Sequence, residues 1–249
     1  MARRRFFVDQ VRNGHAEITG DDAHHLTRVL RVEAGQKFEI TDNRRAWLAE
    51  VEAARKDRVL FHVLEELAAA RELPHVTLYL ALIKFERFEW AVEKATELGV
   101  STIVPVEMNR TERGLLDGAR KRVERWKRIA REASEQSRRL RAPEIADPIR
   151  FAEVLSSASF HRVWMDEQSG AKPLLDAFSF RTGESASVAV GPEGGWIDAE
   201  RSGLAAAGWL PASLGPLILR AETAACAALG VLAQMWLRTE FQTPAATIE

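Results

Sequence analysis

The feature that most limits the fold is an unbroken apolar run followed at once by an amphipathic one. Residues 76–83 read VTLYLALI, as expected for a strand that is covered on both faces. The next stretch, FERFEWAVEKATEL, places apolar side chains at helical spacing and ends at Gly99. The pair predicts one strand-and-helix unit of a layered α/β domain.

This alternation continues along the chain. Strands that are separated by helices predict a mainly parallel α/β sheet. The terminal helix is apolar almost all round and must be buried on several sides, either at a subunit interface or inside one subunit. Strands are predicted over 101–108, 161–167, 185–191 and 212–219, and helices over 85–98, 119–140, 198–208 and 221–237.

The first 68 residues have a different pattern of apolar and polar side chains. Short alternating stretches are broken by turn signals such as Asn13-Gly14 and Asp42-Asn43, which indicates a small, mostly β domain. The exception, DDAHHLTRVLRV, predicts a short helix with Asp21 or Asp22 as its cap. The segment AAARELP resembles a linker. We therefore predict domains at 1–70 and 74–249.

Composition excludes several classes of protein. The chain has 249 residues, 46% of them hydrophobic and 29% charged, which is enough for a sizeable core. It contains no run of about 18 apolar residues, and Asp9 interrupts any signal-type segment. We expect a cytoplasmic protein. The single cysteine, Cys226, excludes disulfides within the chain and cysteine-based zinc sites, and its alanine-rich context favours a buried apolar role.

Charge is distributed unevenly. The formal net charge is -1, yet residues 110–141 carry twelve basic and five acidic side chains. Such a segment is either a solvated helix face with its own ion pairs or a surface for a polyanion. The sequence alone leaves both alternatives open.

A glycine-rich loop follows one predicted strand. Residues 188–197 read VAVGPEGGWI, and the glycines permit positive φ and close approach of backbone to a ligand. The carboxyl end of a strand is where open α/β sheets bind ligands. The spacing matches neither common nucleotide motif, and Glu193 would repel a phosphate. Alone, the loop could equally be a structural turn.

A second glycine-containing loop, LGPLILRAETAAC, follows at 214–226. The two loops together resemble bacterial methyltransferases that modify N3 of a uridine in 16S small-subunit ribosomal RNA, within the trefoil-knotted SPOUT superfamily. The resemblance extends over nearly the whole chain. Its other motifs are RRFFV at 4–8, HHLTRVLRVEAGQ at 24–36, KFERFEWAVEKATELGV at 84–100 and EASEQSRR at 132–139.

The resemblance implies a fold that patterning alone would not predict. Periodicity favours an open, doubly wound sheet, because knotted chains are rare. The family implies instead a knotted, mainly parallel sheet with flanking helices, a PUA-like β-barrel at the N-terminus, and a homodimer. It also implies S-adenosylmethionine as cofactor. The cofactor-binding residues implied are Met165, Gly191, Pro192, Glu193, Gly194, Gly195, Leu214, Gly215, Ile218 and Leu219.

Two residues are candidates for catalysis. Methylation of uracil N3 leaves negative charge on the flanking carbonyl oxygens, which a guanidinium such as Arg220 would stabilise. Glu222 is expected to position Arg220, to take the proton, or to cap the helix that follows. The family pattern has arginine at Leu217, so a cationic contact is missing there.

The expected partner is ribosomal RNA, with phosphate contacts that position it and a flipped-out base in the pocket. No metal is expected, because the neighbouring His24 and His25 point in different directions. Methylation of a ribose hydroxyl or of transfer RNA, and a non-catalytic ribosome-binding factor, are the alternatives. The RNA-binding candidates are Arg4, Arg5, His25, Arg28, Arg31, Lys84, Arg110, Arg138 and Arg139.

Overall fold

The chain folds into two compact units. The computed structural model describes residues 4–68, 73–168, 170–181 and 183–242. The first unit joins residues 1–71 to residues 131–142, and the second comprises 72–130 and 143–249. None of the described helices is long and apolar enough to cross a membrane.

The first unit is built on a five-stranded sheet in the order β1-β3-β4-β5-β2. All neighbouring strands are antiparallel except β1 and β3, which run parallel. Two register shifts between β4 and β5 bend the long central hairpin, so that the sheet curls around one core. The elements are β1 (Arg5–Phe7), β2 (His15–Thr19), α1 (Gly20–Arg28), β3 (Lys37–Thr41), β4 (Ala46–Arg55) and β5 (Arg58–Glu66).

Side-chain alternation explains this core. Along β2, Ala16 and Ile18 are buried while their neighbours are exposed, as period-two patterning requires. Phe6 and Phe61 are fully buried inside the curled sheet. The predicted short helix is present as α1, and its Leu26 packs into the same core. The cap position is Thr19, however, so Asp21 and Asp22 lie in the first turn and do not cap the helix.

A distant segment completes the first unit. Residues 131–142 are separated from the rest of this unit in sequence, yet they cluster with it. The Thr41 hydroxyl donates to the Leu140 carbonyl at 3.0 Å, and the Arg141 Nε donates to the Asn43 carbonyl at 2.8 Å. The Arg138 guanidinium also pairs with the buried carboxylate of Glu39.

The second unit contains an eight-stranded sheet whose paired strands all run parallel. The order is β11-β13-β10-β12-β6-β7-β8, and β9 also pairs with β7. The strands are β6 (Val76–Ala81), β7 (Thr102–Glu107), β8 (Glu144–Ile145), β9 (Ile149–Arg150), β10 (His161–Met165), β11 (Lys172–Pro173), β12 (Ala186–Val190) and β13 (Leu210–Ser213).

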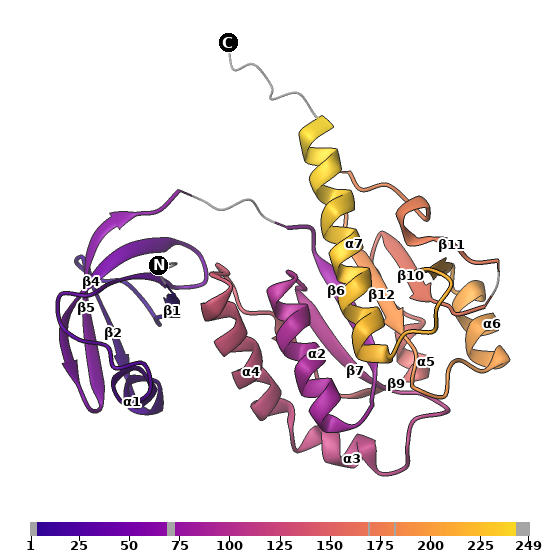
Figure 1. The fold of residues 1–249 in the computed structure, drawn as a ribbon, viewed down its shortest axis with the longest axis horizontal. Coiled ribbons are helices and arrows are strands. Elements are labelled where there is room, and N and C mark those ends of the chain that lie inside the picture. The colour runs from indigo at the N-terminus through magenta and orange to yellow at the C-terminus, as the bar shows by residue number, and fades with distance from the viewer. Residues whose placement is uncertain (1–3, 69–72, 169, 182, 243–249) are drawn as a thin grey trace. The chain divides into compact units, whose positions relative to one another are not determined.

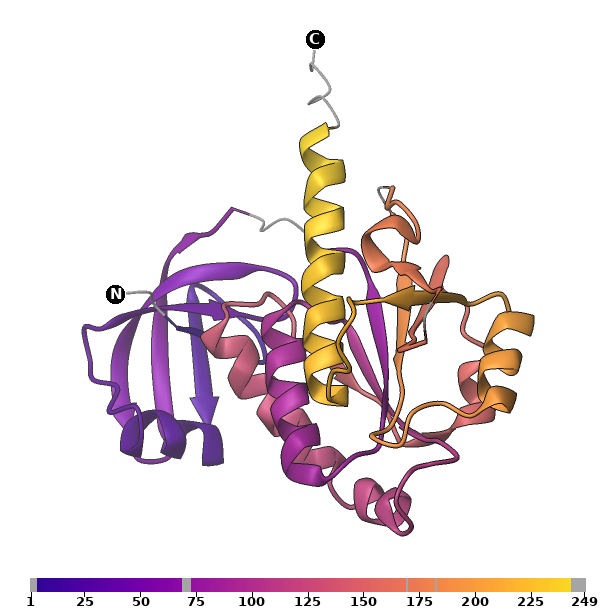
Figure 2. The ribbon, with the colours of Figure 1, turned by 45° about the vertical axis from the view of Figure 1, so that its right-hand side comes forward.

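Both faces of this sheet are covered (Figures 1 and 2). Leu78 and Leu80 of β6 pack with α2 and α7, whereas Ala81 belongs to the core under α5 and α6. The apolar run at 76–83 is therefore buried on both sides, as predicted. The helices are α2 (Phe85–Glu97), α3 (Leu115–Arg120), α4 (Val123–Gln136), α5 (Phe151–Val154), α6 (Asp198–Ala206) and α7 (Ala221–Gln242), with a 3-10 turn at Leu174–Asp176.

Two sequence predictions were wrong in their bounds. The strand expected over 212–219 ends at Ser213, because Gly215 adopts φ +128° and Pro216 has no amide hydrogen to donate. The helix expected over 119–140 is two helices, α3 and α4, with a turn at 121–122. Helix α4 stops at Gln136, and Arg138 takes the left-handed φ of +60°.

Glu135 makes the stability of the first unit depend on pH. Burial raises the pKa of Glu135 to about 7, although Arg131 partly opposes the shift. The folded protein thus holds a proton that an ordinary carboxyl, with a pKa of 4.5, has released. The stability that this proton contributes is full below the ordinary pKa and is lost as the pH rises toward 7.

As the pH rises from about 5 to about 8, the free energy of unfolding should therefore fall less in Glu135→Gln than in the unchanged protein, by roughly 2 to 3 kcal/mol. Denaturant titrations of both proteins across this range measure the difference. Glu132→Gln, an exposed carboxyl on the same helix, is the matched control. Equal pH dependence in all three proteins would contradict the role of Glu135.

Candidate functional site

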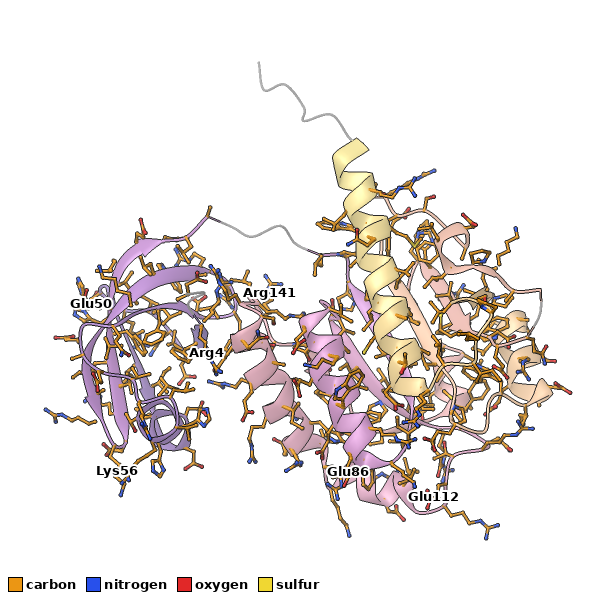
Figure 3. All side chains as sticks on the ribbon, viewed as in Figure 1. Arg4, Glu50, Lys56, Glu86, Glu112 and Arg141 are labelled. Carbon is orange, nitrogen blue, oxygen red and sulfur yellow. The ribbon has the colours of Figure 1, made fainter. Side chains whose placement is uncertain are left out.

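The two glycine loops meet at one cavity of about 480 Å³ in the second unit. It lies where β10, β12 and β13 end, at the carboxyl edge of the parallel strands. In Figure 3, the labelled Glu86 and Glu112 lie at this end of the unit, in the segments that follow β6 and β7. All ten residues predicted to bind the cofactor line the cavity, as does Arg220.

The loop at 191–196 is held in one conformation by its own residues. The Gly195 amide donates to the Pro192 carbonyl at 2.8 Å, which closes a turn. The buried Trp196 anchors the end of the loop, because its indole Nε1 donates to the Met165 carbonyl at 2.8 Å.

The glycines of this loop are needed for contacts within the protein. A Cβ on Gly191 would lie 2.9 Å from the Trp196 indole. A Cβ on Gly195 would lie 3.0 Å from a Glu167 carboxylate oxygen, and the φ of +72° disfavours any side chain there. Close packing of the loop against its support thus accounts for these two glycines.

Three arginines from three segments hold the same loop. Arg87 of α2 pairs with the Glu193 carboxylate. The Arg110 Nη1 donates to the Gly194 carbonyl at 2.6 Å, and the Arg201 Nη1 donates to the Trp196 carbonyl at 2.8 Å. Arg110, a candidate RNA contact, therefore bonds to the cavity wall.

The second loop is more exposed. Leu217 and Ile218 have 78% and 86% of their surface exposed, although both are apolar and line the cavity. Arg220 lies between this loop and α7, and its side chain is exposed. Its guanidinium has no hydrogen-bond or ion-pair partner within the described part of the chain. It is thus available to a ligand.

Glu222 lies in the first turn of α7 and is buried. Its Oε1 is 3.9 Å from the Arg87 Nε. Its Oε2 is inaccessible and has no hydrogen-bond partner among the described residues. A buried carboxylate oxygen without a partner is costly, which makes it a functional candidate.

Sequence reasoning missed several residues of the cavity. Arg87 comes from a helix about a hundred residues earlier, so no local pattern connects it to the loops. Asp166 and Glu167 lie at the end of the strand predicted over 161–167, and Trp196 lies within the stretch VAVGPEGGWI, so their places in the sequence could have indicated them. The additional lining residues are Arg87, Asp166, Glu167, Val190, Trp196, Leu217, Ala221 and Ala224.

The candidate RNA contacts differ in accessibility. Arg5 is buried, and Arg5 and Arg138 both pair with Glu39, so a phosphate would have to displace that carboxylate. Burial lowers the pKa of the Arg139 guanidinium to about 10. The remaining candidates are exposed, except the half-buried His25: Arg4 (labelled in Figure 3), Arg28, Arg31, Lys84 and Arg110.

The described residues include no group of three or more His, Cys, Asp or Glu side chains arranged to hold a metal ion.

Comparisons with known proteins agree with this geometry. Residues 71–233 match the family described as the RNA methyltransferase domain, and residues 18–64 match the RNA methyltransferase PUA domain. The ribosomal RNA small subunit methyltransferase E of Bacillus subtilis is 34% identical over 246 residues, which cover 92% of this chain and 95% of the relative.

Solved structures match over similar lengths. A methyltransferase from Legionella pneumophila, in complex with the bound cofactor SAM, has a TM-score of 0.84 and 27% identity, covering 93% of this chain and 97% of its own. The ribosomal RNA small subunit methyltransferase E from Neisseria gonorrhoeae, bound to S-adenosyl methionine, has a TM-score of 0.82 and 28% identity. The match covers 94% of this chain and 98% of the Neisseria chain.

The expected combination of a mainly parallel sheet, flanking helices and a small PUA-like domain is thus confirmed. The chain belongs to the family of RNA methyltransferases that carry a PUA domain and include the ribosomal RNA small subunit methyltransferases E.

Proposed function

We propose that the protein transfers a methyl group from S-adenosylmethionine to N3 of a uridine in 16S ribosomal RNA. The observation that carries this proposal is the meeting of both glycine loops at one cavity beside Arg220. Relatives named for the small ribosomal subunit support the substrate, and a related structure with bound SAM supports the cofactor.

The cavity suits this cofactor in size and chemistry. About 480 Å³ lies within the range of small-molecule sites. Backbone amide and carbonyl groups at 191–195 and 214–219 can bond to an adenine edge, and the carboxylates of Asp166, Glu167 and Glu193 suit a cation. When bound, the cofactor supplies an electrophilic methyl group.

Arg220 is the proposed catalytic cation. Loss of the N3 proton leaves negative charge on the uracil nitrogen and its flanking carbonyl oxygens. Because its guanidinium is exposed and has no partner among the described residues, Arg220 can donate to those oxygens without breaking an existing bond.

Glu222 is our candidate to accept the N3 proton. Its Oε2 is an unused acceptor, because it is buried without a hydrogen-bond partner among the described residues, although Glu222 is not one of the side chains that line the cavity. Its place in the first turn of α7 also stabilises that helix electrostatically, and the two roles are compatible.

We further propose a homodimer and a trefoil-knotted catalytic domain, as the family resemblance implies. Two exposed apolar side chains at the cavity, Leu217 and Ile218, favour a second subunit that covers them. Leu217 also replaces the family's arginine, so apolar contact substitutes for charge there. The site of action would be the cytoplasm, where bacterial ribosomal RNA is found.

Mass spectrometry of nucleosides tests the proposed reaction. Ribosomal RNA incubated with the protein and labelled cofactor should contain labelled N3-methyluridine, and the free RNA and the assembled small subunit are separate substrates in the assay. A labelled 2'-O-methyl nucleoside, or label in transfer RNA alone, would overturn this proposal and support methylation of a ribose hydroxyl or of transfer RNA instead. Absence of both product and cofactor binding would favour a non-catalytic ribosome-binding factor.

Gly195→Ala should weaken cofactor binding about tenfold, because strain at positive φ moves the cavity wall. Calorimetry with S-adenosylmethionine measures this effect. Gly183→Ala is the matched control, since Gly183 has a φ of +86° but open space at its Cβ position and lies outside the cavity. Equal affinities would remove the loop from the binding site.

Arg220→Ala should lower the turnover number roughly 10²- to 10³-fold with a much smaller change in cofactor affinity, because its charge acts on the reacting base. Single-turnover methylation and calorimetry separate these two quantities. A normal rate would exclude Arg220 from the mechanism.

Replacing Arg28 and Arg31 together with glutamine should weaken RNA binding and reduce the slope of log affinity against log salt by roughly 1.4. Both side chains are exposed, unlike the paired Arg5. Lys37→Gln with Arg58→Gln removes equal charge from residues already paired with carboxylates. If both double variants change the slope equally, Arg28 and Arg31 are not specific RNA contacts.

A further inference from the structure

One guanidinium contacts two acidic side chains, Glu193 in the cavity wall and the buried Glu222. Arg87 lies in the first turn of α2, pairs with Glu193 of the first loop, and has its Nε 3.9 Å from the Glu222 Oε1. No other cation lies within 4.0 Å of the Glu222 carboxylate among the described residues. Arg87 itself is partly exposed and lines the cavity.

The arrangement matches what arginine does and lysine does not. A guanidinium presents five donors in a planar fork, so one side chain can face two carboxylates from different directions. An ionised carboxylate that is buried without a cation is strongly disfavoured. Glu222 is 8% exposed, and Arg87 is the cation nearest to its carboxylate among the described residues.

We propose that Arg87 is a positioning residue, which holds the Glu222 carboxylate in place while it fixes Glu193 in the wall of the cavity. In the folded site the Glu222 Oε1 faces Arg87, whereas its Oε2 is buried and has no hydrogen-bond partner among the described residues. The role of this arrangement in methylation rests on the proposed function. The contact between Arg87 and Glu222 is independent of that function.

Other titratable groups surround this pair. Glu193 faces Arg87 from the loop, Arg220 precedes α7, and Cys226 lies one turn beyond Glu222 on the same helix. Burial raises the pKa of the Cys226 thiol to about 11. Cys226 therefore stays neutral over the range in which the carboxylates titrate.

The first test uses the protein without cofactor or RNA. In Arg87→Gln, the buried Glu222 should hold a proton to higher pH than the unfolded chain does. Stability relative to the unchanged protein should therefore fall as the pH rises from about 5 to about 8. This dependence should vanish when Glu222→Gln is also present. Denaturant titrations measure all four proteins of the cycle.

The second test is the rate of methylation against pH. Arg87→Gln should lower single-turnover methylation roughly 10- to 100-fold and move its acid limb to higher pH. Arg87→Lys should restore the position of that limb with only part of the rate, because a point charge reaches one carboxylate. Lys94→Gln, which removes a cation bridging Glu93 and Glu97 on α2, should leave the profile unchanged.

The outcomes are distinguishable. Additive stability effects of Arg87→Gln and Glu222→Gln, or an unshifted pH profile in Arg87→Gln, would overturn the positioning role. If the stability cycle shows coupling but the unchanged protein forms no methylated nucleoside, the proposed reaction fails while the link between Arg87 and Glu222 stands.

Discussion

Burial of both faces of the parallel sheet is the constraint on which the rest of the second unit depends. Alternate residues of β6, β10 and β12 enter two separate cores, one under α2 and α7 and the other under α5 and α6. With both faces covered by helices, ligands have access mainly at the strand ends and their loops. The cavity forms where the loops after β10, β12 and β13 meet.

Electrostatic interactions then fix the loop at 191–196, the first of the two glycine loops. The first loop is attached through Arg87, Arg110 and Arg201, which come from three different segments. Two of these bonds go to backbone carbonyls, so they hold the conformation of the loop regardless of its side chains. Such prior organisation lowers the cost of binding, because the wall does not have to be ordered by the ligand.

The basic segment at 110–141 combines structural and accessible charges. Arg138 is occupied by Glu39, Arg122 and Arg125 pair with Glu89, and Arg110 bonds to the cavity loop. A count of positive charges therefore overstates the surface available to RNA. Ion pairs occupy some of these cations, as the first alternative left open by the composition requires, and a polyanion surface on the exposed ones stays a prediction.

The sequence by itself determined the α/β class, the β-rich first unit and the two glycine loops, since these follow from local periodicity and turn chemistry. Only the tertiary structure decided that residues 131–142 complete the first unit, and that the expected strand at 212–219 stops at Ser213 to leave an exposed loop. It alone brought Arg87 against Glu193 and Glu222. Contacts between residues a hundred positions apart arise from packing of elements on the sheet, and local sequence patterns carry no signal of that packing.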